Sequence, residues 1–524
     1  MNNSNVDYSQ KVVEMKKITK KFGNFVANDN IDLTVHKGEV HALLGENGAG
    51  KSTLMNILYG LYQPTSGEIH INEKLVSIDN PNIAIENGIG MVHQHFMLVQ
   101  PFTVAQNIIL GTEPVKGLGT VDMKKAIEDV KELSEKYGLY VDPTAKVEDI
   151  TVGMQQRVEI LKALYRGAKI LILDEPTAVL TPQEIEELFK QLKLLKKQGY
   201  TIIFISHKLH EIKELCDRLT VLRDGQTMGT YSVSELSEQE ISKLMVGRDV
   251  DLNIEKTERD FKDAVLKVKK LTVKNSFQNI VVNDVSFTVR EGQILGIAGI
   301  EGNGQSELVN AIIGTTDIVS GKISLVENDI TKESILKRQE LGISHVSEDR
   351  LHFGSAPNLS IEDNAISKIY ASKELNNKGL LNLTKVKEFT TNLVKEFIVK
   401  HDNTKQSIKD LSGGNIQKVI VGREFLYNPK LLIVNQPTRG IDVGAIEFIR
   451  HKILDMREAK KAILLISSDL GEVLSLSDSI IVMHEGKIVG YIEDAKNVTE
   501  EELGLYMLGV KRDSDEIIGG AYYA

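Results

Sequence analysis

The sequence predicts an α/β protein with two tandem copies of one domain, each built on a mostly parallel sheet. Internal repetition is the first reason. The segment NIDLTVHKGEVHALLGENGAGKSTL is matched later by NDVSFTVREGQILGIAGIEGNGQSEL. Gly45 aligns with Gly299, an offset of 299 − 45 = 254, and Asp174 aligns with Asn435, an offset of 435 − 174 = 261. Offsets that change so little along the chain indicate a duplicated domain.

The second reason is the pattern of short apolar runs. EVHALLG, KILILD and YTIIFIS are continuous and rich in β-branched residues. Such runs are typical of strands that are buried on both faces of a parallel sheet. Between the last two runs, TPQE at 181–184 forms a capping box that predicts the start of a helix. We interpret the apolar stripe of that helix as core packing; it comprises Ile185, Leu188, Leu192 and Leu195.

The repeats set the expected domain boundaries. Copy one spans about residues 11–247 and copy two about 264–512. Residues 248–263 are short and charged, which is typical of a solvated linker. Residues 513–524 form a tail that we expect to be loosely held.

Composition excludes several classes of protein. The chain has 524 residues and a net charge of -10, so it lacks the basic balance of a nucleic-acid-binding domain. Cys216 is the sole cysteine, which rules out an intrachain disulfide. The polar start MNNSNVDYSQ is unlike a secretory signal, and no run of 18 apolar residues predicts a membrane span.

A phosphate-binding motif of the form G-x-x-x-x-G-K-[ST] lies between a predicted strand and a predicted helix. Glycines in such a loop let backbone N–H groups curl around phosphate oxygens at a helix N-terminus. The lysine reaches the β- and γ-phosphates, and the following serine offers its hydroxyl to Mg²⁺. The motif residues are Gly45, Glu46, Asn47, Gly48, Ala49, Gly50, Lys51, Ser52 and Thr53.

Polar residues follow two further predicted strands. Asp174 ends the strand ILILD and is a candidate second Mg²⁺ ligand. Glu175 beside it is the candidate general base that polarises the attacking water. His207 follows the strand YTIIFIS at the same edge of the predicted sheet, from which its side chain would contact the γ-phosphate.

These motifs, with HQ at 93–94, SH at 206–207 and LSGGN at 411–415, resemble the ATP-binding subunits of ABC transporters. The resemblance implies two P-loop NTPase domains of the ABC type, each with an antiparallel β subdomain and a helical subdomain. It also implies that two such domains close head-to-tail, so that ATP lies between one phosphate loop and the signature of the other domain. The implied signature contacts are Ser412, Gly413, Gly414 and Asn415.

Two more residues take roles from the resemblance alone. Gln94 is expected to bind Mg²⁺ and water and to couple the site to a membrane partner. Phe22 matches the aromatic residue that stacks on adenine, although Phe25 is close enough to be an alternative.

Copy two departs from the family at the catalytic positions. Gln305 replaces the lysine, Asn435 and Gln436 replace the acid pair, and Ser468 replaces the histidine. Gln94 has no clear counterpart, and the sequence leaves open whether Glu348 substitutes for it. In copy one the signature is altered instead, and reads ITVGM at 150–154. Head-to-tail pairing would therefore create one composite site that hydrolyses ATP and one degenerate site.

Among ABC proteins, VSEDR, QPTRGIDVGA and EPTAVLTPQE resemble the fused ATPase of bacterial importers for nucleosides or simple sugars, most closely the nucleoside branch. The resemblance implies two permease subunits, an extracellular substrate-binding lipoprotein, and a place on the cytoplasmic face of the membrane. A monosaccharide importer ATPase is the alternative. A tandem-ABC translation factor is more remote, because such factors usually keep both sites intact and have a long helical linker. A DNA-repair ATPase would need zinc-binding cysteines.

Overall fold

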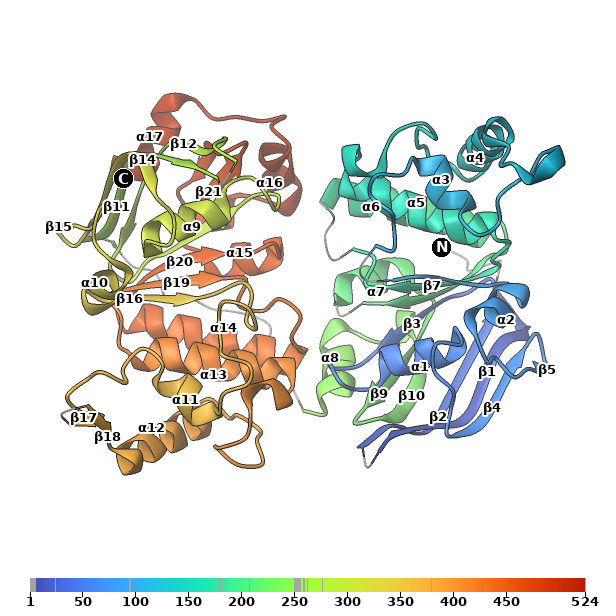
Figure 1. Cartoon of the computed structure of the whole chain (residues 1–524), viewed down its shortest axis with the longest axis horizontal. Coiled ribbons are helices and arrows are strands. Elements are labelled where there is room, and N and C mark those ends of the chain that lie inside the picture. The colour runs from blue at the N-terminus through green and yellow to red at the C-terminus, as the bar shows by residue number, and fades with distance from the viewer. Residues whose placement is uncertain are drawn as a thin grey trace. The chain divides into compact units, whose positions relative to one another are not determined.

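The computed structural model describes residues 6–23, 25–93, 96–177, 180, 182–206, 208–248, 256–257, 260–261, 263–275, 277–377 and 379–523. The chain divides into two compact units, Met1–Val250 and Asp251–Ala524 (Figure 1). Each unit contains one six-stranded and one four-stranded sheet, as a duplicated α/β domain requires.

The six-stranded sheet of the first unit carries the apolar runs that the sequence singled out. The central strands pair in parallel and only the edge strand β10 runs antiparallel to its neighbour. In spatial order the strands are β10 (Gln226–Ser232), β9 (Arg218–Arg223), β3 (Val40–Leu44), β8 (Thr201–Ile205), β7 (Ile170–Asp174) and β6 (Ile89–Val92).

The second unit repeats this order strand for strand. Its parallel sheet also ends in one antiparallel edge strand, β22. Its strands are β16 (Ile343–Val346), β19 (Leu431–Asn435), β20 (Ala462–Ile466), β13 (Ile294–Ala298), β21 (Ser479–His484) and β22 (Lys487–Ile492). The predicted parallel core is thus confirmed in both copies.

A smaller antiparallel sheet packs beside each parallel sheet. In the first unit it comprises β2 (Phe25–Lys37), β1 (Asp7–Phe22), β4 (Ser66–Ile71) and β5 (Lys74–Leu75). In the second unit it comprises β12 (Ile280–Arg290), β11 (Ala264–Lys274), β14 (Ile318–Leu325) and β15 (Asn328–Asp329), and a separate hairpin joins β17 (Asn376–Asn377) to β18 (Leu380–Leu381).

Helices cover the sheets and form a helical layer in each unit, where α3, α4 and α5 pack together and α11, α12 and α13 do the same. In the first unit the helices are α1 (Lys51–Leu58), α2 (Pro81–Glu86), α3 (Val104–Ile109), α4 (Met123–Tyr137), α5 (Val152–Tyr165), α6 (Pro182–Lys197), α7 (Leu209–Leu215) and α8 (Glu238–Val246). In the second unit they are α9 (Gln305–Ile313), α10 (Ile335–Glu340), α11 (Ile361–Ile366), α12 (Leu383–Glu396), α13 (Gly413–Leu426), α14 (Val443–Glu458), α15 (Leu470–Leu476), α16 (Glu500–Met507) and α17 (Asp515–Tyr523).

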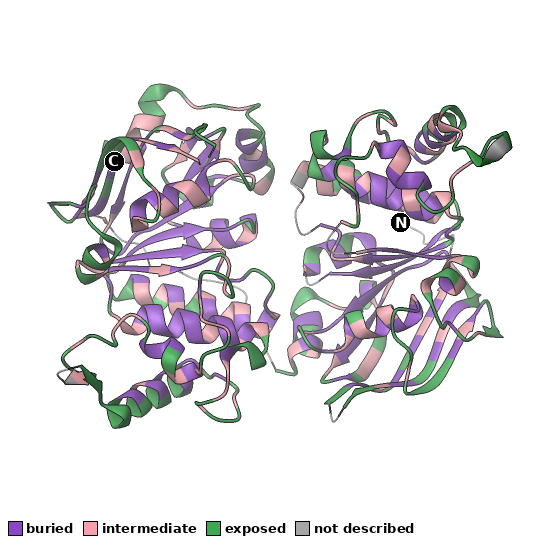
Figure 2. Cartoon of the chain, viewed as in Figure 1, coloured by how far each residue is buried: buried purple, intermediate pink, exposed green. Residues whose placement is uncertain are grey.

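Side chains of the parallel strands alternate between two apolar layers. Ile433 of β19 joins the core shared with the antiparallel sheet and α9, whereas Leu432 and Val434 join the core under the helical layer. The strands are therefore buried on both faces (Figure 2). This double burial explains why their sequences are continuous apolar runs rather than alternating ones.

The chain end is better ordered than the sequence predicted. Residues 513–524 were expected to be loosely held, but α17 packs against β12 and β22. Ala521 is buried, and the Thr288 hydroxyl donates to the carbonyl of Tyr522 over 2.8 Å. The loose-tail expectation is wrong because apolar residues in the last helix find a partner surface on the sheet.

The residues described near the end of the expected linker contact the second unit. Arg457 is almost fully buried and forms an ion pair with Asp478 over 2.9 Å. Its guanidinium also donates to the carbonyl of Thr257 over 2.9 Å and lies against the ring of Phe261. Lys256 donates to the carbonyl of Ser477. These residues are anchored to the second unit because a buried guanidinium requires hydrogen-bond acceptors.

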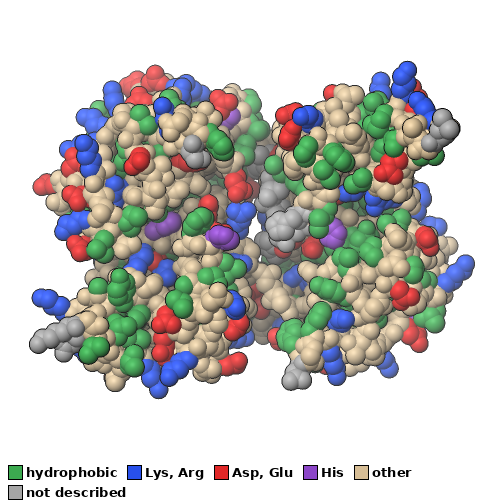
Figure 3. Space-filling model, viewed as in Figure 1, with side chains coloured by type: hydrophobic (Ala, Val, Ile, Leu, Met, Phe, Trp, Pro, Cys, Tyr) green, Lys and Arg blue, Asp and Glu red, His purple; other side chains and the backbone are tan. Residues whose placement is uncertain are grey.

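Charged side chains are mixed by sign on the face of each unit that Figure 3 shows, with no basic stripe there. Within the described residues, no helix combines the length and the apolar character that crossing a membrane requires.

Candidate functional site

The first phosphate loop joins buried strand β3 to helix α1 and depends on its glycines. Gly45 and Gly50 have φ angles of 149° and 96°. A Cβ at residue 45 would lie 2.3 Å from the carbonyl oxygen of Leu222, and one at residue 50 would lie 2.6 Å from the carbonyl oxygen of Ala27. Both contacts are too short for any side chain, so only glycine allows this path.

Helix α1 begins with Gly50 as its N-cap and has no side-chain cap. The Lys51 side chain is buried, and its ammonium donates to the carbonyls of Gly45 over 2.7 Å and Glu46 over 3.0 Å. Ser52 is exposed in the first helical turn. A cationic group and a helix N-terminus thus come together where the sequence places an anion site.

The acid pair lies at the end of β7. Glu175 adopts a left-handed conformation, with φ 48°, while its N–H still donates to Ile205 of β8 over 3.0 Å. Burial, with a further contribution from the charge of Glu175, raises the pKa of Asp174 to about 6, against the opposing charge of Lys51. The three charged groups of the predicted site are therefore near neighbours, and Asp174 is short of compensating charge.

The residues present fit Mg²⁺ and ATP. A hydroxyl from Ser52 and a desolvated carboxylate from Asp174 are the hard oxygen ligands that Mg²⁺ takes, with phosphate oxygens completing its shell. A cation here would offset the burial that raises the pKa of Asp174. The loop is open at Gly48, where no other part of the described chain would lie within 4 Å of a Cβ.

Not every predicted residue can be placed. Gln94 and His207 lie outside the described residues. Phe22 and Phe25 pair across the turn between β1 and β2, and both rings are exposed, so either remains available for adenine. The sequence reasoning missed Tyr62, whose ring lies 5.5 Å from that of Phe22 at an interplanar angle of 80°. In the sequence, an aromatic residue just after the helix of a phosphate loop is only a weak signal of an adenine contact.

The second phosphate loop keeps this backbone without its charges. Gly302 and Gly304 have φ angles of 92° and 97°, close to those of Gly48 and Gly50. The Gln305 amide donates to the carbonyl of Ile300 over 3.1 Å, in the manner of the Lys51 ammonium. The loop therefore folds without a lysine.

The amide that replaces the acid Glu175 is held by its neighbour. Gln436 has φ 52°, and its N–H donates to Ile466 over 2.8 Å, so its backbone matches that of Glu175. Its Oε1 accepts hydrogen bonds from the N–H and hydroxyl of Ser468 over 3.0 and 3.1 Å. The amide is thus occupied in a structural contact.

The two signature helices begin differently. Ser412 precedes α13 without capping it, and its hydroxyl instead accepts from the Asn415 side chain over 2.8 Å. Thr151 caps α5 by accepting from the N–H of Met154 over 3.3 Å. Val152, at the position of Gly413, is 40% exposed. A bulky side chain and an internal cap both oppose the approach of a phosphate to the start of α5.

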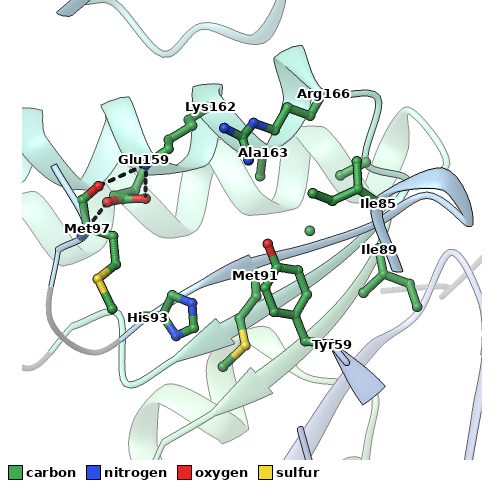
Figure 4. Close-up of a pocket in the computed structure, with 12 residues that line it drawn as sticks. Tyr59, Ile85, Ile89, Met91, His93, Met97, Glu159, Lys162, Ala163 and Arg166 are labelled. Atoms are coloured by element: carbon green, nitrogen blue, oxygen red, sulfur yellow. Dashed lines mark hydrogen bonds and ion pairs between the residues drawn. The ribbon is translucent and has the colours of Figure 1, made fainter. Parts of the chain in front are cut away.

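A pocket of about 110 Å³ lies beside β6 and α5 in the first unit, and none of its lining residues belongs to the phosphate loop (Figure 4). The backbone of Met97 is tied to α5 there. Its N–H donates to Glu159 over 2.6 Å, and its carbonyl accepts from Lys162 over 2.9 Å. The pocket is lined by Tyr59, Ile85, Ile89, Gly90, Met91, His93, Met97, Glu159, Lys162, Ala163, Arg166 and Ala168.

The family model for ABC transporters matches residues 28–178 and 282–439, one match in each unit and together more than half of the chain. The chain belongs to the ABC transporter family. It is an ATPase of this family, with the phosphate loop and acid pair of the first unit in place. The resemblance and the fold expected from the sequence are confirmed.

Three curated relatives of similar length illustrate the relationship. The nucleoside import ATP-binding protein NupA of Lactococcus lactis subsp. cremoris is 50% identical over 96% of this chain and 99% of its own. The guanosine import ATP-binding protein NupO of Bacillus subtilis is 50% identical over 95% and 97%. The ribose import ATP-binding protein RbsA of Caldanaerobacter subterraneus is 41% identical over 95% and 99%.

Among solved structures, the RNase-L inhibitor is 19% identical, with a TM-score of 0.62 over 94% of this chain and 93% of its own. At this identity the likeness concerns the fold alone. It shows that another chain has the same tandem ABC fold.

Proposed function

We propose that the chain is the ATP-hydrolysing subunit of an importer that takes up a nucleoside through separate membrane permeases. The observation that carries this proposal is the 50% identity, over almost the whole length, to two importer ATPases named for nucleoside and guanosine. Importers of ribose and galactose match at 41% and 40% identity, so a monosaccharide importer is the second candidate.

We also propose that the first phosphate loop pairs with the second signature to form the active composite site, and that the reverse pair forms the degenerate site. The distribution of defects supports this arrangement. Gln305, Gln436 and the capped, valine-bearing start of α5 would all fall in one site. Lys51, Glu175 and the exposed Ser412 would fall in the other.

In the active site each side chain has one task. Lys51 holds the β- and γ-phosphates, and Glu175 accepts a proton from the attacking water, with His207 contacting the γ-phosphate. Ser52, Asp174 and Gln94 would hold Mg²⁺, which neutralises phosphate charge when bound. The backbone N–H groups after Ser412 cap the γ-phosphate in the closed state.

Coupling to the permeases runs through the segment after Gln94. Met97 is bonded to both Glu159 and Lys162, so a displacement of this segment moves α5 as well. The adjoining pocket has an apolar floor from Ile89 and Met91 and charged groups from α5, and its size suits a single side chain of a permease (Figure 4). The partners we propose are two permeases and an extracellular binding lipoprotein, with this chain on the cytoplasmic face of the membrane.

The importer proposal is tested by uptake in cells that lack this chain but are otherwise unchanged. Restoring the chain is expected to restore accumulation of radiolabelled guanosine or another nucleoside, and excess unlabelled ribose should not compete. Uptake of labelled ribose or galactose without nucleoside uptake would favour the second candidate. Restoration of neither would refute the importer proposal.

Gln305→Lys alone is expected to leave steady-state ATP turnover unchanged. The substitution returns one charge to the second loop, but the base position is still the amide of Gln436, which Ser468 holds. Turnover of the variant and the wild-type chain should be measured side by side with colorimetric phosphate release. A twofold rise would mean that fewer groups are missing from this site than we propose.

A further inference from the structure

Glu348 stands in the second unit where Gln94 stands in the first. It follows β16 by two residues, as Gln94 follows β6, and the offset of 348 − 94 = 254 equals that of the phosphate loops. The sequence left this correspondence open, because SHVSEDR and MVHQH share little. The matching strand order of the two sheets resolves it.

Contacts of Glu348 join the second phosphate loop to the end of β19. Its Oε2 accepts from the hydroxyl of Ser306 over 3.0 Å and from Nδ2 of Asn435 over 3.3 Å. Ser306 and Asn435 are the counterparts of Ser52 and Asp174, which are two of the three proposed Mg²⁺ ligands of the first unit. The carboxylate of Glu348 therefore lies between these two counterparts, although it follows β16, whereas the carboxylate of Asp174 lies at the end of β7 in the first unit.

Asn435 supplies an independent sign of a missing ligand. Its side chain is only 4% exposed, and its Oδ1 has no hydrogen-bond partner among the described residues. An orphaned buried carbonyl oxygen beside a carboxylate is costly unless a donor or a cation satisfies it. Both oxygens are of the kind that Mg²⁺ prefers.

The two sites thus contain the same side-chain types in exchanged positions. The first has a carboxylate on the central strand, Asp174, and an amide after the edge strand, Gln94. The second has an amide on the central strand, Asn435, and a carboxylate after the edge strand, Glu348. One anionic metal ligand is retained in each, although the second site has lost its lysine.

We propose that Glu348, Ser306 and Asn435 form a Mg²⁺ site that holds a nucleoside di- or triphosphate on the second phosphate loop without hydrolysing it. The proposal rests on the ATP chemistry of the proposed function but not on the transported solute. Gln305 brings no charge, and Glu348 by itself repels phosphate. Nucleotide therefore binds there only together with the divalent cation, whereas the first loop also has Lys51.

The test counts bound Mn²⁺ by electron paramagnetic resonance in the full chain with saturating ADP. Two ions per chain are expected for the wild-type protein and one for Glu348→Gln, whose remaining affinity for the second ion should be about tenfold or more weaker. Ser52→Ala should remove the other ion. The matched control is Glu340→Gln, which makes the same change at an exposed carboxylate on α10 that pairs with Lys337. Thermal unfolding checks that each variant is folded.

Labelled ADP adds a second readout. In Lys51→Ala, the remaining ADP should dissociate on addition of EDTA and return with Mg²⁺, and Asn435→Asp should tighten this binding. The proposal would be overturned if Glu348→Gln still bound two Mn²⁺ ions. It would also be overturned if the wild-type chain bound one ion that only Ser52→Ala removed. If the wild-type chain binds a single ion that is lost in Glu348→Gln and kept in Ser52→Ala, the Mg²⁺ site at Glu348 is upheld. The same result would refute the proposed catalytic site in the first unit.

Discussion

Glu175→Gln is expected to retain bound ATP and to lower turnover by roughly 10²–10⁴-fold, the range that general base catalysis supplies. The substitution removes the proton acceptor while keeping the shape of the side chain. The second unit indicates that the fold tolerates it, since Gln436 occupies the equivalent position with φ 52° against 48° for Glu175. Phosphate release and filter-bound ATP measure the two effects separately.

The control for Glu175→Gln is Glu186→Gln, which makes the same chemical change on an exposed part of α6, where Glu186 forms an ion pair with Lys190. Its turnover should equal that of the wild-type chain. If Glu175→Gln kept most of its rate, Glu175 would not be the base. If it lost ATP binding as well, the residue would have a binding role instead.

The same ATP-retaining variant tests the proposed head-to-tail pairing. The sole native cysteine, Cys216, is buried, so it should not interfere with thiol cross-linking. Cysteines introduced at Asn47, in the first loop, and at Asn415, in the second signature, should be joined by a short bifunctional reagent only when ATP is present. ATP-independent cross-linking, or none under either condition, would contradict the composite site.

Lys51→Ala is expected to abolish measurable turnover and to weaken ATP binding strongly. A unit charge pair about 4 Å apart near a protein surface contributes about 4 kcal/mol, and a tenfold effect requires only about 1.4 kcal/mol. Lys51 also opposes the rise in the pKa of Asp174, so its loss leaves that carboxyl less ionised near neutral pH. Equilibrium dialysis and phosphate release provide the measurements.

Lys74→Ala is the matched control for Lys51→Ala, because Lys74 is an exposed lysine on β5 away from the loop. Circular dichroism should confirm that both variants are folded, since the amide of Gln305 shows that the loop forms without a lysine. Substantial turnover in Lys51→Ala would place the catalytic site elsewhere.

Much of the fold was readable from the sequence because burial on both faces leaves a direct signature. Runs such as KILILD and YTIIFIS are typical of strands in a covered parallel sheet, and both form such strands. The tail was misread because the surface that holds it is distant in sequence. Thr288, which donates to the carbonyl of Tyr522, lies 234 residues away along the chain.

The sequence by itself determined the fold, the phosphate loop, the acid pair and the replacement of their charged residues in the second copy, because these depend on residue types at short spacing. Only the tertiary structure decided what Glu348 touches. Its neighbours Ser306 and Asn435 are 42 and 87 residues distant in the chain. Strands that pair side by side bring the loops at their ends together, however far apart these loops are in the sequence. A carboxylate after one strand can therefore occupy the same place as a carboxylate on the neighbouring strand.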